Sequence, residues 1–407
     1  MLTALENGVR GGKWYSLMDK VHSLANLRGA FALVKANQGS PGVDHETIEM
    51  FEERLEHNLC RLAEALRSGT YRPQAIKRVW IPKPGTKEKR PLGIPTVRDR
   101  VVQAALRNVL EPIFERDFAC HSYGFRPGHG CKDALRRVDA LLHQGYAYVV
   151  DADLKSYFDT IPHDLLMARI REKIADNPVL ALVDSFLRQR VMDTLEGWIP
   201  ETGTPQGAVM SPLLSNIYLD PLDHLMAGHH IQMVRYADDF VILCRTEGEA
   251  LRALALVQTW TAQASLTMHP VKTRIVDATA PGGFDFLGYH FEQGMRGPRS
   301  KSLKKLKDAI RVQTRRCNGH SLCEIISTIN RILVGWFAYF KHSHSRTFGP
   351  LDGWIRMRLR SILRQRHGGC GRGRGFDHLR WPNAFFAEHR LFFLTTAHRL
   401  ACQSARR

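Results

Sequence analysis

The sequence predicts an α+β fold with a mixed or antiparallel sheet, joined to a basic, largely helical C-terminal region. Strand-like and helix-like stretches alternate as far as residue 295. Within them, residues 233–244 (MVRYADDFVILC) place two apolar runs around Ala-Asp-Asp, the pattern of a β-hairpin. A hairpin inside the alternation favours antiparallel pairing over a doubly wound parallel sheet. From residue 296 onward, cations recur at helical spacing instead.

Charge is distributed unevenly along the 407 residues. The formal net charge of +18 comes from 58 Lys and Arg against 40 Asp and Glu. Residues 1–295 hold 34 basic and 35 acidic side chains, a net of −1, whereas residues 296–407 hold 24 and 5, a net of +19. A near-neutral body with a strongly basic end is typical of a protein that binds a polyanion, with nucleic acid the first candidate. An anionic membrane surface fits the same charge, so charge alone leaves the partner open.

The composition excludes several classes of protein. Hydrophobic residues make up 44% of the chain and aromatics 9%, which excludes global disorder. The longest apolar run, Ile332–Phe340, is too short to span a bilayer, and the first twenty residues lack the apolar core of a signal peptide. Eight cysteines without a CxxC pair favour a reduced, cytoplasmic protein. Four Cys and His residues cluster without zinc-ligand spacing, and we expect loop and core residues there: Cys120, His121, His129 and Cys131.

The first 145 residues predict helices around one pair of strands. Residues 17–70 carry leucines at helical spacing, and the Gly and Pro residues of 37–44 predict a turn that interrupts them. Residues 76–96 predict two short strands joined by a basic turn. Helices are expected over 97–118 and 131–143, separated by a Gly- and Pro-rich loop.

Further strands and helices are predicted up to residue 295. Tyr146–Asp153 (YAYVVDAD) is β-branched, aromatic and preceded by a glycine, which predicts a strand. Residues 160–200 are expected to be mostly helical. The remaining predicted elements are a helix that ends at Leu225 after the loop 203–212, a helix over 248–265, and strands near 272–278 and 284–291.

The basic end predicts three helices and a small terminal module. A second helix carries an apolar stripe from Ile325 to Phe340, and we expect its aromatic side chains in a core more than as base-stacking platforms. Residues 367–375 (HGGCGRGRG) predict a flexible basic hinge before an ordered module at 381–398. The first and third helices repeat cations three or four residues apart, and we expect these rows to contact phosphates without reading sequence: Lys304, Lys307, Arg311, Arg315, Arg356, Arg360 and Arg364.

Two groups of carboxylates can carry chemistry. Asp238 and Asp239 form the tip of the predicted hairpin. Asp is common in turns, but two like charges beside an apolar sheet need a cationic partner. Asp151 and Asp153 share one face of their strand because strand side chains alternate. If the two segments are neighbours in one sheet, three carboxylates converge. Such a group suits two Mg²⁺ ions, which stabilise the attacking and leaving oxygens of a phosphoryl transfer.

Ordered sequence blocks connect these carboxylates with the rest of the chain. The central blocks are VVDADLKSYFDTIPHDLL (149–166), GTPQGAVMSPLLSNIYLDPLD (203–223) and VRYADDFVIL (234–243). Supporting blocks are GSPGVD (39–44), IPKPGTKEKRPLGIPTVRDRVVQAAL (81–106), SYGFRPGHGCKDAL (122–135), FDFLGYHF (284–291), INRILVGWFAYFKHS (329–343) and WPNAFFAEHRL (381–391). In this order the blocks resemble the motif set of reverse transcriptases, and more narrowly the reverse transcriptase/maturase proteins encoded by bacterial group II introns.

The resemblance implies a right-hand polymerase with fingers, a palm whose antiparallel sheet carries the catalytic aspartates, and an α-helical thumb. The implied domains are an N-terminal extension and fingers (1–140), the palm (141–295), a helical thumb or maturase domain (296–366) and a small basic DNA-binding-like module (367–407). The implied function is RNA-directed DNA synthesis, coupled to splicing of a group II intron RNA and its retromobility. The implied partners are the structured intron RNA, a DNA primer or target, and dNTPs, without a membrane.

The resemblance also implies roles for the carboxylates and one lysine. Asp153, Asp238 and Asp239 would bind two Mg²⁺ ions, which Mn²⁺ can replace, with Asp151 as a supporting residue. Lys272, in HPVKT, corresponds to a lysine that protonates the leaving pyrophosphate. Electrostatic contact between Lys272 and the phosphates fits equally well.

Five residues are implied to bind the incoming nucleotide: Lys83, Arg90, Leu154, Phe158 and Gln206. Phe158 matches the aromatic ring that blocks a ribose 2′-OH, although without the resemblance a buried core phenylalanine is the simpler interpretation. Gln206 matches a residue near the nucleotide and template. The basic turn is one or two residues longer than the family pattern, so Lys87 and Lys89 compete with Lys83 for the triphosphate.

Three interpretations of function stay open at the level of sequence. The first is an active reverse transcriptase and maturase, the second an RNA-binding splicing factor with an unused polymerase site, and the third a domesticated relative in DNA repair or phage defence. The sequence ends at Arg407 without the His-Asn-His nuclease module of many family members, so we expect nicking to come from elsewhere. The intron, the DNA target and the oligomeric state are left open.

Overall fold

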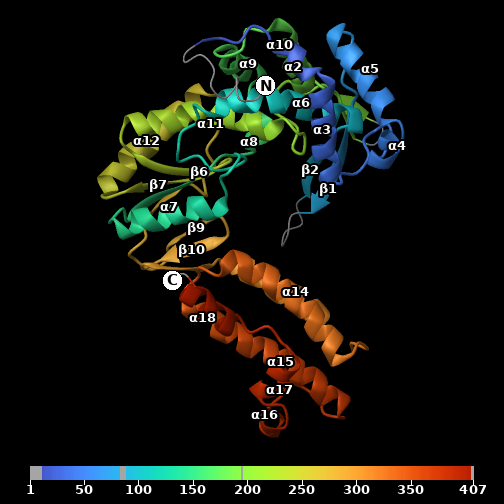
Figure 1. The fold of residues 1–407 in the computed structure, drawn as a ribbon. Coiled ribbons are helices and arrows are strands. Elements are labelled where there is room, and N and C mark those ends of the chain that lie inside the picture. The colour runs from blue at the N-terminus through green and yellow to red at the C-terminus, as the bar shows by residue number, and fades with distance from the viewer. Residues whose placement is uncertain (1–11, 83–88, 194–195, 405–407) are drawn as a thin grey trace. The chain divides into compact units, whose positions relative to one another are not determined.

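The computed structural model describes residues 12–82, 89–193 and 196–404. It divides into two compact units, residues 1–275 and 276–407 (Figure 1). The division falls 20 residues before the expected start of the thumb at 296, because the short strands after residue 283 pack with the helices that follow them. Each unit has its own apolar core.

The N-terminal helices of unit 1 form around the predicted turn at 37–44. They are α2 (Met18–Val21), α3 (Leu24–Ala36), α4 (Ile48–Glu53) and α5 (Leu55–Arg67). Ser23 and Thr47 cap α3 and α4, where each side chain accepts a hydrogen bond from a backbone N–H three residues later. The leucines at helical spacing in α5 face the core, which confirms the predicted periodicity: Leu59, Leu62 and Leu66.

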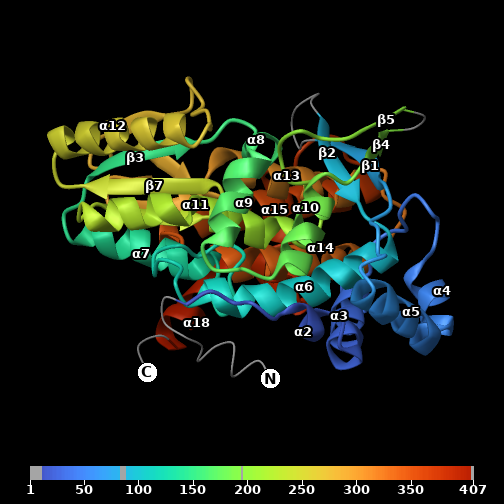
Figure 2. The same ribbon diagram turned by 90° about the horizontal axis from the view of Figure 1, so that it is seen from above.

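The first sheet has the strand order β2-β1-β4-β5. Its strands are β1 (Ile76–Pro82), β2 (Lys89–Ile94), β4 (Val191–Asp193) and β5 (Glu196–Trp198) and lie together in Figure 2. The predicted pair β1 and β2 is confirmed as antiparallel. The expectation of mostly helical structure over 160–200 missed β4 and β5, because three-residue strands show no periodicity and acquire their pairing only from β1.

Helices α6 (Val97–Glu115) and α7 (Cys131–His143) confirm two further predictions. The first is the most deeply buried helix of unit 1 and packs against α3. Three helices lie between β3 (Tyr148–Asp153) and β4: α8 (Tyr157–Thr160), α9 (His163–Arg171) and α10 (Asn177–Leu187).

The second sheet of unit 1 has the strand order β6-β7-β3-β8. Its strands are β3 (Tyr148–Asp153), β6 (Gln232–Tyr236), β7 (Asp239–Cys244) and β8 (Arg274–Asp277). The pairs β6–β7 and β7–β3 are antiparallel, as the hairpin predicted. Helix α12 (Glu247–Gln263) packs on β3 and β7, whereas α7 and α11 (Ser211–Gly228) pack on β6 (Figure 1).

Unit 2 opens with a three-stranded sheet of order β11-β10-β9. The strands are β9 (Phe284–Phe286), β10 (Tyr289–Glu292) and β11 (Met295–Pro298). The single strand predicted near 284–291 is therefore wrong. Leu287 and Gly288 both have positive φ, 46° and 84°, which turns the chain back into a tight hairpin.

Helices make up the rest of unit 2. They are α13 (Ser300–Gln313), α14 (Leu322–Phe340), the short 3₁₀ helix η1 (Ser345–Thr347), α15 (Phe348–Arg366), α16 (Phe376–Arg380), α17 (Asn383–Glu388) and α18 (Leu394–Ser404). The apolar stripe of α14 is part of the core, where Ile329 and Leu333 are fully buried and Trp336 and Phe337 pack against the core's edge. In the parts of the chain that the structure describes, no helix combines the length and apolar character needed to cross a membrane.

A buried carboxylate joins α6 to the first sheet. Asp99 is 1% exposed and accepts hydrogen bonds from the Tyr71 hydroxyl (2.5 Å), the Gln74 backbone N–H (3.0 Å) and the Gln189 side-chain amide (2.9 Å). Burial raises the pKa of Asp99 to about 6, although these donors oppose the shift. The folded protein therefore binds a proton at Asp99 at a pH where the unfolded chain does not.

We predict that Asp99 makes unit 1 more stable as the pH falls from about 6 towards the usual aspartate value near 3.8. Because the folded-state pKa lies above the unfolded one, the contribution grows by about 1.4 kcal/mol per pH unit inside this window. The free energy of unfolding in urea, measured for wild type and Asp99→Asn, should show a difference that rises in favour of wild type on acidification. A difference that does not change with pH would contradict the raised pKa.

Candidate active site

Three aspartates meet at one end of the second sheet. Strands β6 and β7 are joined by Ala237 and Asp238, since Tyr236 pairs directly with Asp239. Strand β7 also pairs with β3, in a register that sets Asp153 opposite Asp239. The prediction that the two segments are neighbours in one sheet is therefore confirmed. We call residues 236–239 the aspartate turn.

A glycine next to the aspartate turn makes its backbone geometry possible. Ala237 has a φ of 59°, which the first residue of such a tight turn needs but which alanine rarely adopts. The segment at Ser122–Gly124 runs alongside β6, and the Tyr123 N–H donates to the Arg235 carbonyl at 2.8 Å. A Cβ on Gly124 would lie 2.1 Å from the Ala237 nitrogen, so any larger residue would displace the turn.

A fully buried arginine, Arg235, fixes the backbone of the aspartate turn by a hydrogen bond. The Arg235 guanidinium forms an ion pair with Asp223 through Nε (2.8 Å) and Nη2, and its Nη1 donates to the Ala237 carbonyl at 2.9 Å and to Asn216 at 3.0 Å. Asn216 in turn donates to the Gly124 carbonyl at 2.8 Å. Burial lowers the pKa of Arg235, but the charge and hydrogen bonds of Asp223, together with Tyr157 and Asp220, outweigh burial and the pKa ends up raised. Sequence reasoning missed this network, although a charge inside an apolar strand signals it.

The aspartates repel one another. Burial raises the pKa of Asp238, and the charge of Asp153 raises it further, while Arg90 and Arg235 oppose the shift. Asp153 is paired with the Lys272 ammonium, and Asp151 lies 3.3 Å from the Arg274 guanidinium. Cations thus already pair with the two carboxylates of β3. Only the resemblance to reverse transcriptases predicted a role for Lys272 at this site, and the Lys272 ammonium lies directly against Asp153.

The donor set at this end of the sheet is made of carboxylate oxygens, the ligands that hard divalent cations prefer. Among the described residues, no three His, Cys, Asp or Glu side chains stand in a preformed metal cage. The raised pKa of Asp238 indicates that burial and the Asp153 charge leave its carboxylate short of positive charge. The residues therefore fit a divalent cation whose binding would draw the carboxylates together, rather than a metal site that is already formed without the cation.

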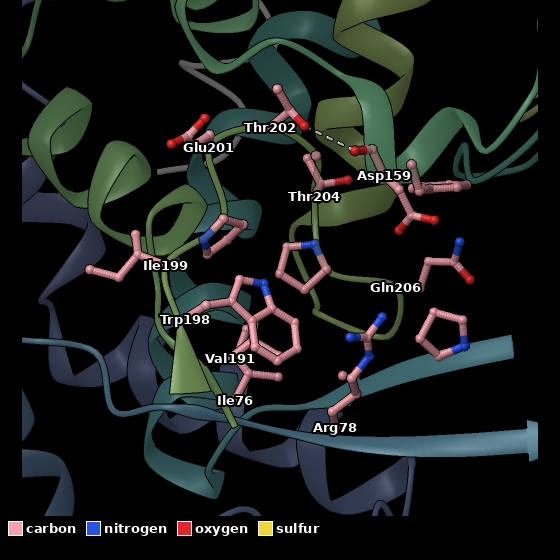
Figure 3. Close-up of a pocket in the computed structure, with 16 residues that line it drawn as sticks. Ile76, Arg78, Asp159, Val191, Trp198, Ile199, Glu201, Thr202, Thr204 and Gln206 are labelled. Carbon is pink, nitrogen blue, oxygen red and sulfur yellow. Dashed lines mark hydrogen bonds between the residues drawn. The ribbon is translucent and has the colours of Figure 1, made fainter. Parts of the chain in front are cut away.

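The loop 203–207 lies between β2 and α8. Gly203 packs so closely on α8 that a Cβ would lie 2.8 Å from the Phe158 carbonyl. A Cβ on Gly207 would lie 2.6 Å from the Gly93 carbonyl oxygen, and the Gly93 N–H donates to the Gln206 carbonyl at 2.7 Å. Both glycines therefore allow close packing of protein backbone. They position Gln206 at the edge of a cavity of about 600 Å³ (Figure 3).

Phe158 lines the same cavity as Gln206. Its ring packs edge-on against Tyr157 (5.4 Å between centroids) and Phe125 (6.5 Å), and is half-buried against the core. Tyr157 is fixed beneath it, since its hydroxyl donates to the Ser215 carbonyl at 2.8 Å. The ring of Phe158 is thus held by its neighbours yet still reaches the open cavity.

The other predicted nucleotide-binding residues are in different positions. Lys83 and Lys87 lie outside the described residues, and Lys89 and Arg90 are exposed at the start of β2. Arg90 is close enough to Asp238 to lower its pKa. Leu154 is 4% exposed and its side chain is part of the apolar core, while its role at the nucleotide stays a prediction.

Of the four cations predicted to share one face of α13, only three lie on the helix. Lys304 and Arg311 are exposed on the helix, and Lys307 is half-buried. Both Lys307 and Arg311 lie about 6 Å from the Trp354 ring (6.0 and 5.8 Å). The helix ends at Gln313, so Arg315 is exposed in the loop beyond it rather than on the predicted helical face.

The arginine row of α15 requires a correction. Arg360 is 4% exposed, and its guanidinium donates to the Trp381 carbonyl (2.8 Å) and to Asn383 (2.9 Å). Arg364 donates to the Cys370 carbonyl and is paired with Asp377, and both partners lie in the segment that follows α15. These two arginines hold the segment after residue 366 onto α15. Arg356 is half-buried, 5.6 Å from the Phe393 ring.

We predict that Asp223→Asn destabilises unit 1 by about 3–5 kcal/mol, because it leaves the buried Arg235 charge without a counterion. The matched control is Asp117→Asn, which removes an exposed carboxylate 2.7 Å from Lys173 and should cost less than about 1 kcal/mol. Urea unfolding measures both. Equal losses in the two variants would show that the buried pair does not support the fold.

Two family models match the chain. The model described as "Reverse transcriptase (RNA-dependent DNA polymerase)" matches residues 81–291, and the model described as "Group II intron, maturase-specific domain" matches residues 303–380. Each match falls largely within one of the two units. The first contains the aspartate turn, Asp153, Phe158 and Gln206.

Individual relatives align over about half of the chain. Protein YkfC of Escherichia coli is 40% identical over 196 residues, which cover 47% of this chain and 51% of YkfC. The group II intron-encoded protein LtrA of Lactococcus lactis is 37% identical over 196 residues, 48% of this chain and 32% of LtrA. Among solved structures, telomerase from Candida albicans aligns with a TM-score of 0.43 at 13% identity, over 78% of this chain and 64% of that one. Because the first family model covers more than half of the residues, the chain belongs to the reverse transcriptase family, and it carries a group II intron maturase-specific domain.

Proposed function

We propose that this protein is an RNA-directed DNA polymerase whose active site is the aspartate turn together with Asp153. The observation that carries the proposal is the strand register. Asp153 and Asp239 are opposite each other on adjacent strands, with Asp238 at the turn between β6 and β7. The family is generally dependent on divalent metal ions, and the oxygen donors here suit Mg²⁺, with Mn²⁺ as a substitute. Two such ions would supply charge stabilisation at the attacking primer 3′-OH and at the leaving pyrophosphate.

The chain's own side chains would then divide the work of binding and orientation. Asp153, Asp238 and Asp239 hold negative charge where the cations gather. Lys272, which is paired with Asp153, would stabilise or protonate the leaving pyrophosphate. Arg90 is exposed near Asp238 and can meet the triphosphate with two parallel hydrogen bonds. Lys83, Lys87 and Lys89 remain candidates for the same task.

Phe158 and Gln206 would select the nucleotide. The Phe158 ring is braced by Tyr157 and Phe125 and lines the cavity beside Gln206. A braced ring under the sugar excludes a 2′-OH by contact, which favours dNTPs over rNTPs. Gln206 is held by the backbone contact with Gly93, so its side chain has a fixed starting point from which to meet a base.

The basic unit 2 would bind a structured group II intron RNA, both as template and as splicing substrate, with a DNA primer or target as second partner. Support comes from the maturase-specific match at 303–380 and from the exposed cations Lys304, Arg311 and Arg315. The half-buried Lys307 and Arg356 can add to them, whereas Arg360 and Arg364 are engaged within the unit. Phosphate contacts of this kind position an RNA without reading its sequence.

We predict that Asp238→Asn abolishes primer extension on an RNA template, by at least about 100-fold, because the amide cannot supply the charge that the divalent cations require. RNA binding and splicing of the cognate intron should be retained. Asp164→Asn is the control, since that carboxylate is 96% exposed and lies away from the aspartate turn. Primer extension by gel and splicing by product analysis measure both functions.

The same experiment tests the rival function. A wild-type protein that promotes splicing but extends no primer on any RNA template would be a splicing factor with an unused site. Extension without any effect on splicing would favour a domesticated polymerase instead.

We also predict that the triple variant Lys304→Ala, Arg311→Ala, Arg315→Ala lowers the salt dependence of RNA binding. The slope of log affinity against log salt should fall by about 0.7–0.9 for each RNA phosphate that the variant no longer neutralises. The control triple variant removes three exposed, carboxylate-paired cations of unit 1: Arg28, Arg67 and Arg136. A slope that is unchanged in the first variant would mean that RNA is bound elsewhere.

A further inference from the structure

Aromatic side chains are exposed on one face of the first sheet. Residues 76, 78 and 80 of β1 share this face because strand side chains alternate. Val191 pairs with Ile76 on one side and with Trp198 on the other, which brings Trp198 to the same face. Trp80 is 43% exposed and Trp198 39% exposed. Large rings left this open to water on a short sheet do not serve the core of unit 1.

An arginine lies against both tryptophans. The Arg78 guanidinium is 4.4 Å from the Trp80 ring centroid and 4.9 Å from that of Trp198, both within cation–π distance. The Trp80 indole N–H donates to Asp193 at 3.0 Å, which fixes its ring. We call Arg78, Trp80 and Trp198 the stacking platform. Its three planar groups come from β1 and β5 and hold one another in place.

The stacking platform opens into the cavity of the candidate active site. Arg78 and Trp198 line the same 600 Å³ cavity as Phe158 and Gln206, and Figure 3 shows Arg78, Trp198 and Gln206 around it. Asp159 and Glu201 line the cavity as well. Two carboxylates repel a phosphate but accept hydrogen bonds from the amino groups of a base. The cavity therefore fits a nucleobase better than a triphosphate.

We propose that the stacking platform holds an unpaired template base immediately before it reaches Gln206. This inference rests on the proposed polymerase function. Flat aromatic and guanidinium groups bind any base by its π face, which is what a polymerase needs from a template of varied sequence. The neighbouring Ile199, which is 63% exposed and lines the same cavity, extends the apolar surface along which a single strand would pass.

The test uses a primer–template duplex whose single-stranded overhang carries 2-aminopurine at one position at a time. This base loses fluorescence when it stacks. The full-length protein carries Asp238→Asn, so that binding is measured without turnover. We expect quenching at one overhang position near the primer end, and loss of that quenching in Trp198→Ala. Trp198→Phe should restore it, because phenylalanine still stacks.

Affinity provides a second measurement. Trp198→Ala should weaken binding of the overhang duplex by about 5- to 150-fold, the loss of one stacked base, and leave binding of a blunt duplex unchanged. Tyr15→Ala is the control, since that ring is 73% exposed elsewhere in unit 1. Thermal unfolding of each variant establishes that it is folded.

The outcomes separate this inference from the proposed function. Quenching and affinity that are the same in Trp198→Ala and in the Tyr15→Ala control would overturn the stacking platform, even if wild type extends primers. Position-specific quenching that depends on Trp198, in a wild-type protein that extends no primer, would support the platform and contradict the polymerase.

Discussion

The buried ion pair between Arg235 and Asp223 is the interaction on which the candidate active site depends. Removing a guanidinium and a carboxylate from water is costly, and the cost is recovered only when nearly every donor is satisfied. Here Nε, Nη1 and Nη2 of Arg235 all have acceptors, among them the Ala237 carbonyl inside the aspartate turn. The pair thus connects α11 and β6 directly to the backbone that presents Asp238.

A polar support is needed because the aspartate turn cannot be held by apolar packing. Under the proposed function its carboxylates stay open to cations and substrate, and their like charges repel one another. The backbone underneath is therefore fixed by hydrogen bonds from Arg235 and by the close approach of Gly124. The same solution recurs at Gln206, where glycines allow backbone contact between β2 and the loop 203–207. Rigid backbone leaves the reactive side chains free to respond to ligands.

The basic charge of unit 2 has two physical roles. Lys304, Arg311 and Arg315 are exposed, although Arg311 is also paired with Asp308. Arg360, in contrast, bonds to Trp381 and Asn383, and so joins the terminal segment to α15. Net charge therefore overstates the number of phosphate contacts, because an arginine has enough donors to act as a structural connector as well. The expected salt dependence follows the exposed cations and not the total.

The sequence by itself determined most of the elements and the order of the motifs. The alternation in β3 and the apolar runs around Asp238 and Asp239 predicted the antiparallel sheet, because strand periodicity and hairpin patterns are local. The motif order predicted the family. Residues whose role depends on partners far along the chain were not predictable in this way. Gly124, Asn216 and Arg235 meet only when the sheet, α11 and the loop before α7 come together.

The tertiary structure alone decided which of the residues with equivalent spacing are exposed to solvent. Arg356, Arg360 and Arg364 are equivalent in spacing, yet Arg360 is buried because the terminal segment packs over it. Trp198 lies in a stretch expected to be helical, and pairing of β4 with β1 turned that stretch into a strand beside Arg78. Spacing specifies which side chains share a face of one element. Whether that face meets solvent or another segment depends on long-range packing, which no local pattern encodes.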